Sequence, residues 1–136
     1  MEVQQAIEFS VYLDQRPGEL AGVLEAAAAG GVEITGMAVT EHLDRGLVRL
    51  LGRPQEQLRH VCESLVESGA GPVVEFEVLL VKIDQRPAAP LDIARHLAEA
   101  DINVRYAYLV TDNGNKFLVL RVSDGSRGAE VIAAMD

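Results

Sequence analysis

Apolar and polar residues alternate along residues 8–13, so that Phe9, Val11 and Leu13 would lie on one face of a strand. Pro17 and Gly18 interrupt this alternation, and apolar residues then recur at helical spacing over residues 20–27. Two glycines at positions 30 and 31 end the predicted helix. The beginning of the chain therefore predicts a strand, a turn and a helix.

The residues up to position 73 continue this unit with three more strands and one more helix. The pattern predicts a strand over residues 32–40, a hairpin turn at Asp44-Arg45-Gly46 and a returning strand over residues 47–51. A second helix follows from Pro54, and another strand begins at Val73. The order β-α-β-β-α-β predicts the ferredoxin-like α+β arrangement, a four-stranded antiparallel sheet with two helices on one face.

The unit is repeated at an offset of 70 residues. Asp14-Gln15-Arg16-Pro17 recurs as Asp84-Gln85-Arg86-Pro87. The same offset matches apolar positions without a gap, including Phe9 with Leu79, Val23 with Ile93, Val32 with Ile102 and Leu50 with Leu120. A period of this length suits two small units better than a solenoid. We expect a first unit over residues 1–72 and a second over residues 73–136.

The second unit has the same order of elements but ends before its own fourth strand. We expect strands at residues 78–83, 102–110 and 116–122, with a hairpin turn at Asn113-Gly114. Helices are predicted over residues 90–100 and 126–135. Residues 3–7 correspond to residues 73–77 and can supply the missing strand, and residues 73–84 contain no turn signal. The two units would then share one antiparallel sheet, with helices on one face.

Composition and charge narrow the possible functions. The 136 residues are 49% hydrophobic and carry a formal net charge of -9, which argues against direct binding of a nucleic acid backbone. One Cys excludes a disulfide framework, and its place on an apolar helix stripe indicates a core thiol. The His residues lack metal-ligand spacing, and no run is apolar enough to span a membrane. With no secretory signal visible, we expect a cytoplasmic protein without a metal or cofactor.

The loops at the repeat resemble a known family. Arg16-Pro17-Gly18-Glu19-Leu20, an amphipathic helix and Gly30-Gly31-Val32-Glu33-Ile34 resemble the opening of an ACT domain, and Asn103 matches the Asn of that opening in the second unit. The chain departs from the pattern at Glu33 and at Ala88, which replaces the Gly. Leu13 and Ile83 occupy the position of the His found in serine-binding ACT domains, so serine recognition of that kind is not expected. The resemblance implies a free-standing tandem ACT protein, a non-enzymatic regulator that senses an amino acid.

The resemblance and the chemistry of the loops point to the same candidate site. A helix N-terminus suits a carboxylate, Gly18 permits close approach to the backbone, and Asp14 or Asp84 could meet an ammonium group. The candidate ligand-binding residues are Asp14, Gln15, Arg16, Pro17, Gly18, Glu19, Leu20, Asp84, Gln85, Arg86 and Asn103. The alternative is that the repeated loop is only a strand-to-helix connection, and Pro90 with Ala88 favours this for the second loop.

Three functions remain open from the sequence. The first is an amino-acid sensor that regulates a metabolic enzyme or another regulator by protein contact. The second is a structural or regulatory subunit without a small ligand, and the third is a small enzyme of the acylphosphatase type, since fold does not fix function. We also expect a homodimer, because the sheet face away from the helices would expose Val78, Leu80, Tyr106 and Tyr108. The sequence does not name the amino acid or the partner.

Overall fold

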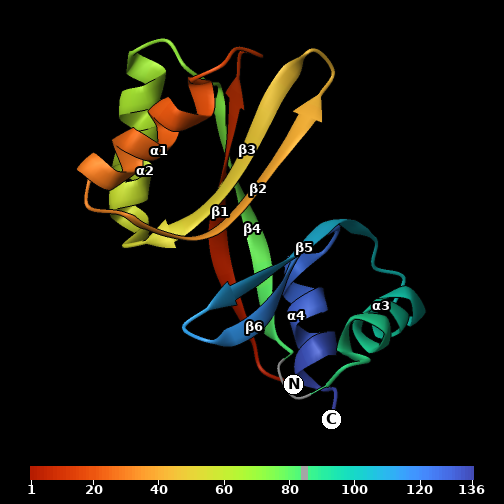
Figure 1. Cartoon of the computed structure of the whole chain (residues 1–136). Helices are drawn as coiled ribbons and strands as arrows, with labels where there is room; N and C mark the ends of the chain where they lie inside the picture. Colours follow the sequence, from red (N-terminus) through yellow and green to blue (C-terminus); the bar gives the residue numbers. More distant parts are fainter. Residues whose placement is uncertain (84–85) are drawn as a thin grey trace. The chain divides into compact units, whose positions relative to one another are not determined.

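The computed structural model describes residues 1–83 and 86–136. In this part of the chain, strands and helices follow in the predicted order (Figure 1). They are β1 (Val3–Leu13), α1 (Glu19–Ala29), β2 (Glu33–His42), β3 (Arg45–Arg53), α2 (Gln55–Glu67), β4 (Val73–Lys82), α3 (Ala89–Glu99), β5 (Val104–Asp112), β6 (Asn115–Val122) and α4 (Gly125–Ala133).

The strands form one sheet with the order β2-β3-β1-β4-β6-β5. The chain therefore has the predicted α+β fold, two ferredoxin-like units that share an antiparallel sheet. The two compact units are residues 7–76, called the N-terminal unit below, and residues 1–6 with 77–136, called the C-terminal unit. Neither β1 nor β4 breaks where the units meet along the chain, so each long strand belongs to both units. A boundary between residues 72 and 73 stays a prediction.

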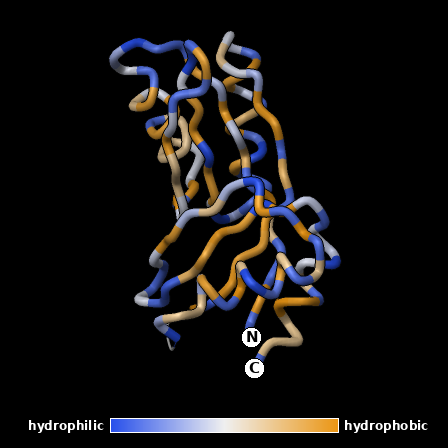
Figure 2. The backbone as a smooth tube through the Cα atoms, turned by 90° about the vertical axis from the view of Figure 1, so that its right-hand side faces the viewer, coloured by the Kyte–Doolittle hydropathy of each residue, from blue (hydrophilic) through white to orange (hydrophobic). Residues whose placement is uncertain are grey.

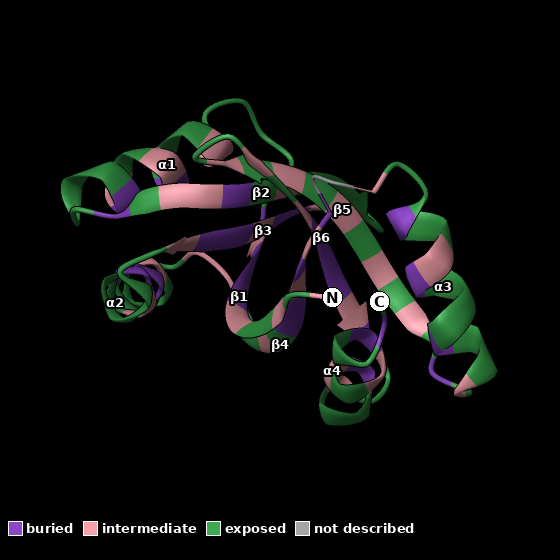
Figure 3. Ribbon diagram, turned by 90° about the horizontal axis from the view of Figure 1, so that it is seen from below, coloured by how far each residue is buried: buried purple, intermediate pink, exposed green. Residues whose placement is uncertain are grey.

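The core of the N-terminal unit lies between its strands and helices α1 and α2. Its buried members are Phe9, Val11, Leu13, Val23, Ala27, Val32, Val48, Leu50, Leu58, Val61 and Cys62. On β1 and β3 these are alternate residues, so the helices cover one face of the sheet. Each fully buried Leu or Phe contributes about 1.5–3 kcal/mol, which makes this face the main source of the unit's stability. Figure 3 shows that the helices are buried along part of their surface only.

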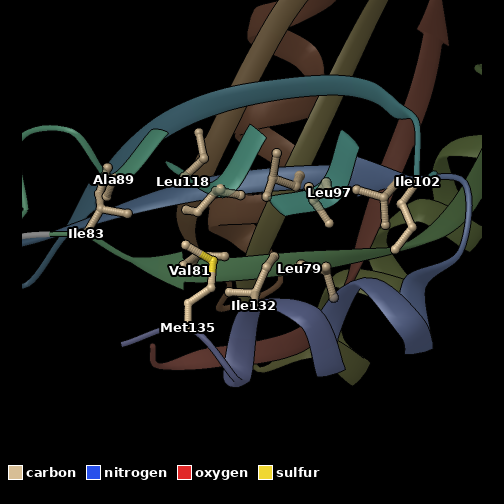
Figure 4. Packing of buried hydrophobic residues seen from close by; sticks show 12 residues of the cluster. Leu79, Val81, Ile83, Ala89, Leu97, Ile102, Leu118, Ile132 and Met135 are labelled. Atoms are coloured by element: carbon tan, nitrogen blue, oxygen red, sulfur yellow. The ribbon is translucent and has the colours of Figure 1, made fainter. Parts of the chain in front are cut away.

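The C-terminal unit repeats this packing with α3 and α4. Its buried residues are Leu79, Val81, Ile83, Ala89, Ile93, Leu97, Ile102, Leu118, Leu120, Val122, Ile132 and Met135 (Figure 4). The beginning of the chain lies beside β4 in this unit, where the Lys82 backbone N–H donates to the Glu2 carbonyl at 3.1 Å. In Figure 2 hydrophobic stretches run along the strands of this unit, near the marked chain ends. Residues from both ends of the sequence thus build one core.

The two hairpins show where the sequence pattern was reliable. Asn113 and Gly114 have φ values of 52° and 79°, the left-handed conformations of a two-residue hairpin turn, which confirms the predicted turn. The other predicted hairpin is also present, but its turn lies at Leu43 and Asp44 instead of Asp44-Arg45-Gly46, because Arg45 already pairs with His42 in β3. Leu43, with φ at 58°, adopts a left-handed conformation that its residue type does not predict.

The sheet face away from the helices differs from the expectation in one respect. Tyr108 and Leu80 are both registered with Val119, so they share a face as predicted. The expected exposure of Val78 is wrong, because only 1% of its surface is accessible. Leu80, Tyr106 and Tyr108 are half-buried.

Candidate functional site

The loop between β1 and α1 turns at Gly18. This residue precedes the first helical residue, Glu19, and has φ 92° and ψ -13°, a left-handed conformation that glycine adopts without strain. Among the residues that the structure describes, no side chain caps the helix at this point. The first N–H groups of a helix have no partner within the helix. The Glu19 N–H donates to the Arg16 carbonyl at 3.4 Å, so the backbone donors that α1 presents beside the loop are those that follow Glu19 in its first turn.

Charged side chains of this loop pair with one another. The Arg16 guanidinium lies 2.7 Å from Glu19 Oε1 and 3.3 Å from Asp14 Oδ2. A second guanidinium, that of Arg45, lies 3.7 Å from Asp14 Oδ1. The Gln15 amide donates to Glu41 at 2.9 Å. Because Arg16 and Asp14 are 68% and 61% exposed, these pairs orient the loop more than they stabilise the fold.

A pocket of about 260 Å³ opens beside this loop. It is lined by Tyr12, Leu13, Asp14, Arg16, Glu19, Arg45 and the segment Ser68, Gly69, Ala70 and Gly71. Arg45 donates to the Gly71 carbonyl at 2.9 Å, and its guanidinium lies 6.0 Å from the centre of the Tyr12 ring. The pocket thus combines two guanidinium groups, two carboxylates and a phenol with the N-terminus of α1, which equips it for a small polar ligand.

The predicted residues of the first loop divide between the pocket and its surroundings. Asp14, Arg16 and Glu19 line the pocket. Gln15, Pro17 and Gly18 are exposed in the same loop, and Leu20 packs against the core. Sequence reasoning missed Tyr12, Arg45 and residues 68–71. Arg45 reaches the pocket through strand pairing, because Leu13 is registered with Gly46 and the hairpin therefore lies beside the loop.

The corresponding loop of the C-terminal unit has a different construction. The predicted residues Asp84 and Gln85 lie outside the described residues. Arg86 Nη2 lies 3.2 Å from Asp92 Oδ2 in the first turn of α3, and Arg86 also donates to the Asp136 carbonyl. Ala88, at the helix start, has φ -90°, and Ala89 is completely buried. Figure 4 shows Ala89 beside Ile83 at one end of the core.

Asn103 does not join this second loop. Its backbone N–H donates to Ser123 Oγ at 2.9 Å, and its carbonyl accepts from the Ser123 N–H at 2.9 Å. These two hydrogen bonds lie next to the pair Val104–Val122, at the end of β6. The second loop instead follows the last residues of β4, where Lys82 is registered with Phe117 near the beginning of β6. The structure therefore separates Asn103 from Arg86 by the length of the strands.

Cys62 has the surroundings of a core residue. Burial raises the pKa of the Cys62 thiol to about 11, and the negative charges of Glu75 and Glu63 act in the same direction. A thiol of this kind is protonated at neutral pH, as expected for a core residue. Among residues 1–83 and 86–136, no group of three or more His, Cys, Asp or Glu side chains is placed to hold a metal ion. No helix in the described part of the chain is long and apolar enough to cross a membrane.

An Arg-centred cluster on α2 was not predicted from the sequence. Arg59 donates to both oxygens of Glu75, at 3.0 and 2.8 Å, and also to Glu56. The guanidinium lies 5.6 Å from the centre of the Phe9 ring. The Arg59 hydrogen bonds lower the pKa of the Glu75 carboxyl. This cluster joins α2 to the beginning of β4 within the N-terminal unit.

These features define a class of protein: a pair of ferredoxin-like units with a polar pocket at a strand-to-helix loop. A family model described as the ACT domain pair matches residues 1–136. The chain therefore belongs to the ACT domain pair family, as the resemblance in its loops suggested. No curated protein matches the sequence.

Solved structures share the fold at low sequence identity. Protein BT0572 from Bacteroides thetaiotaomicron superposes with a TM-score of 0.82 and 20% identity, over 96% of this chain and 88% of that one. The ligand-free regulatory subunit of aspartate kinase from Thermus thermophilus has a TM-score of 0.65 and 13% identity, over 96% and 95% of the two chains. For aspartokinase alpha and beta subunits the values are 0.61 and 16%, over 97% and 95%.

Proposed function

We propose that this chain is a non-enzymatic sensor of an amino acid and that it regulates a metabolic enzyme or another regulator by direct contact. The observation that carries the proposal is the match of an ACT domain pair to the whole chain, residues 1–136. The similarity in fold to the regulatory subunit of an aspartate kinase supports an enzyme as the partner. The loop pocket beside β1 and α1 supports a ligand of small size and mixed charge.

The proposed ligand binds with its carboxylate against the backbone between Arg16 and Leu20. The first turn of α1 supplies the positive end of the helix dipole and the N–H groups that follow Glu19, whose own N–H donates to the Arg16 carbonyl. A Cβ built on Gly18 would meet no atom of the described residues within 4 Å, so the space beside this backbone position is open. The ligand ammonium group lies near Asp14 or a main-chain carbonyl. Since Asp14 is shared by Arg16 and Arg45, an ammonium group there competes with two guanidinium groups.

The same ion pairs favour the alternative of a regulatory subunit without a small ligand. Asp14, Arg16 and Glu19 already neutralise one another, and the Gln15 amide is bonded to Glu41. A loop whose polar groups are satisfied in this way needs no ligand to keep its conformation. These pairs also occupy Arg16, the residue that an acylphosphatase-like activity would use to hold a phosphate.

We further propose that the chain acts as a homodimer. The half-buried Leu80, Tyr106 and Tyr108 on the sheet face away from the helices support this, although the burial of Val78 makes the patch smaller than expected. A two-fold dimer is the commonest way to cover such a face. Sedimentation at micromolar concentration tests the proposal, and a species of 14.7 kDa would contradict it.

Calorimetric titration with each of the twenty amino acids tests the sensor proposal. Sub-millimolar binding of one amino acid supports a sensor, and no binding by any of them supports the ligand-free subunit. The first-loop variant Gly18→Val is expected to weaken binding about tenfold or more, because the left-handed backbone disfavours a β-branched residue and the loop must shift. Ala88→Val is the matched control in the second loop. Unchanged affinity in Gly18→Val, or a greater loss in Ala88→Val, would move the ligand away from the first loop.

A further inference from the structure

A second pocket lies in the C-terminal unit, on the sheet face away from α3 and α4. It has a volume of about 370 Å³, within the range of about 300–1,000 Å³ that small-molecule sites occupy. Its lining residues are Glu2, Val3, Gln4, Leu80, Lys82, Asn115 and Phe117, all from β4, β6 and the beginning of the chain. None of them belongs to the loop site described above.

Strand geometry explains how these side chains meet. Leu79, Val81 and Ile83 face the core under the helices, so Leu80 and Lys82 face the other way. Lys82 is registered with Phe117, and its backbone N–H binds the Glu2 carbonyl at 3.1 Å. Backbone hydrogen bonds therefore hold Lys82 beside both Phe117 and the beginning of the chain.

Two opposite charges line this pocket without neutralising each other. Among the described residues, neither the Glu2 carboxylate nor the Lys82 ammonium group forms an ion pair within 4.0 Å, with the other or with any third group. The carboxamides of Gln4 and Asn115 add hydrogen-bond donors and acceptors, and the apolar surface comes from Leu80 and Phe117. This contrasts with the first loop, where Asp14, Arg16 and Glu19 pair locally.

We propose that this pocket binds a small zwitterion with an apolar body. The ligand carboxylate pairs with the Lys82 ammonium group, its ammonium group pairs with the Glu2 carboxylate, and its apolar part lies over Leu80 and Phe117. Each charged contact is of the strong, charge-assisted kind. A ligand with only one of the two charges leaves the other protein charge unpaired, so the pocket selects the zwitterion.

The internal repeat supports a pair of sites with different chemistry. The offset of 70 residues relates Lys82 to Tyr12 and Asn115 to Arg45, and both Tyr12 and Arg45 line the pocket at the first loop. Corresponding strand positions thus line a pocket in each unit, with an ammonium group and a carboxamide in one and a phenol and a guanidinium in the other. The inference goes beyond the proposed function, because it requires no ligand at Gly18.

Backbone amide NMR with L-leucine as the probe tests the proposal. L-leucine is expected to shift the amides of residues 80–82 and 115–117 in a saturable manner. Two analogues, 4-methylpentanoate without the ammonium group and 3-methylbutylamine without the carboxylate, are expected to bind about tenfold more weakly or worse. Equal binding of either analogue, or no shift at these residues up to the solubility limit of L-leucine, would overturn the proposal.

Variants that each remove one charge from the pocket provide a second test of the proposal. Lys82→Gln and Glu2→Gln are each expected to weaken L-leucine binding about tenfold. Lys116→Gln and Glu77→Gln remove the same charges from exposed positions that do not line the pocket, and their affinity is expected to match the parent. Unchanged affinity in both Lys82→Gln and Glu2→Gln would overturn the proposal.

The Gly18→Val variant separates this inference from the proposed function. If the variant keeps the L-leucine shifts at residues 80–82, the second pocket binds independently of the first loop. If L-leucine instead shifts only residues 14–20 in the parent, the second pocket is overturned while the sensor proposal is supported.

Discussion

The loops after β1 and β4 share the sequence Asp-Gln-Arg-Pro but differ in the residues after the proline. In the first loop Gly18 is exposed in a left-handed conformation, Arg16 is 68% exposed, and a pocket opens beside the helix. In the second loop Ala88 has a negative φ, Arg86 is 36% exposed, and Ala89 is completely buried in the core. The repeated arginine therefore pairs within an exposed loop in one unit, whereas in the other it is less exposed and pairs with Asp92 in the first turn of α3.

This difference shows that the residue before the helix, Gly18 or Ala88, goes together with the backbone conformation at the helix start. A left-handed glycine lets the chain enter the helix from an open turn. An alanine with helical-type φ, followed by a buried alanine and Pro90, brings the helix start against Ile83 and the core (Figure 4). A ligand site is thus expected where the loop remains outside the core.

The largest expected effect is that of overpacking the second loop. Ala89→Leu inserts a larger side chain at a completely buried position and is expected to destabilise the protein by about 2–3 kcal/mol. Glu19→Leu, at the corresponding position of the first loop, is expected to cost less than about 1 kcal/mol, because Glu19 lies at the surface beside Arg16. Urea unfolding of both variants measures the difference. Equal destabilisation would mean that the loops are packed alike.

The second-largest expected effect on stability comes from changing the backbone preference of the residue before each helix. Gly18→Ala places a Cβ on a residue with φ 92° and is expected to cost about 1–2 kcal/mol from backbone strain alone, since the Cβ meets no atom within 4 Å. The reverse change, Ala88→Gly, is expected to cost about 1 kcal/mol or less through greater freedom of the unfolded chain. Thermal unfolding measures both, and a stabilised Gly18→Ala variant would contradict the assigned conformation.

The repeated arginines give a smaller effect. Arg86→Ala removes the pair with Asp92 and a bond to a backbone carbonyl, and is expected to cost about 1 kcal/mol. Arg16→Ala removes only exposed pairs and is expected to change stability by less than about 0.5 kcal/mol. Denaturant midpoints of both variants and the parent, measured at low and high salt, test this difference. Because salt screens the exposed pairs of Arg16 more strongly, the effect of Arg16→Ala is expected to decrease more at high salt than that of Arg86→Ala.

The smallest expected effect is a pH dependence confined to the N-terminal unit. The pKa of Glu75 is lowered in the folded state by Arg59, so the ionised pair stabilises folding above the ordinary Glu pKa of about 4.3. This contribution is lost as the pH falls through the lowered pKa. Glu75→Gln is therefore expected to lower stability slightly at pH 7 and to match the parent in acid. Amide hydrogen exchange, resolved for residues 7–76 and 77–136, measures this, with Glu77→Gln as the control.

The repeat at an offset of 70 residues and the alternation of apolar and polar residues were sufficient to predict most of the fold. Local signals such as Asn113-Gly114 and the glycines after α1 act within a few residues, so their effect can be predicted from sequence. The turn at Leu43 could not be predicted in this way, because leucine lacks the preference for a left-handed conformation that Asn and Gly have. Burial of Val78 could not be predicted either, because strand alternation alone assigns this residue to the face away from the helices, yet only 1% of its surface is accessible.

The candidate site could be predicted only in part. Asp14, Arg16 and Glu19 were predicted because they lie on one short loop, and residues close together in the sequence are then also close together in the structure. Arg45 and residues 68–71 reach the same pocket from a hairpin and from the end of a helix. The charge balance of the loop depends on Arg45 and Glu41, and pairing between distant segments has no signal in a single sequence.

The two long strands also bear on how such a protein can be inherited and taken apart. Residues 1–6 belong to the unit that otherwise comprises residues 77–136, so that unit is not encoded by one uninterrupted stretch of gene. A fragment that begins at residue 77 lacks the strand whose Glu2 carbonyl bonds to Lys82. Recombination that cuts the coding sequence in half would deliver neither unit whole. The pair is expected to pass between genes as a single module, and a permuted chain that begins at residue 77 and continues through residue 136 into residues 1–6 would be the shortest route to isolating its second half.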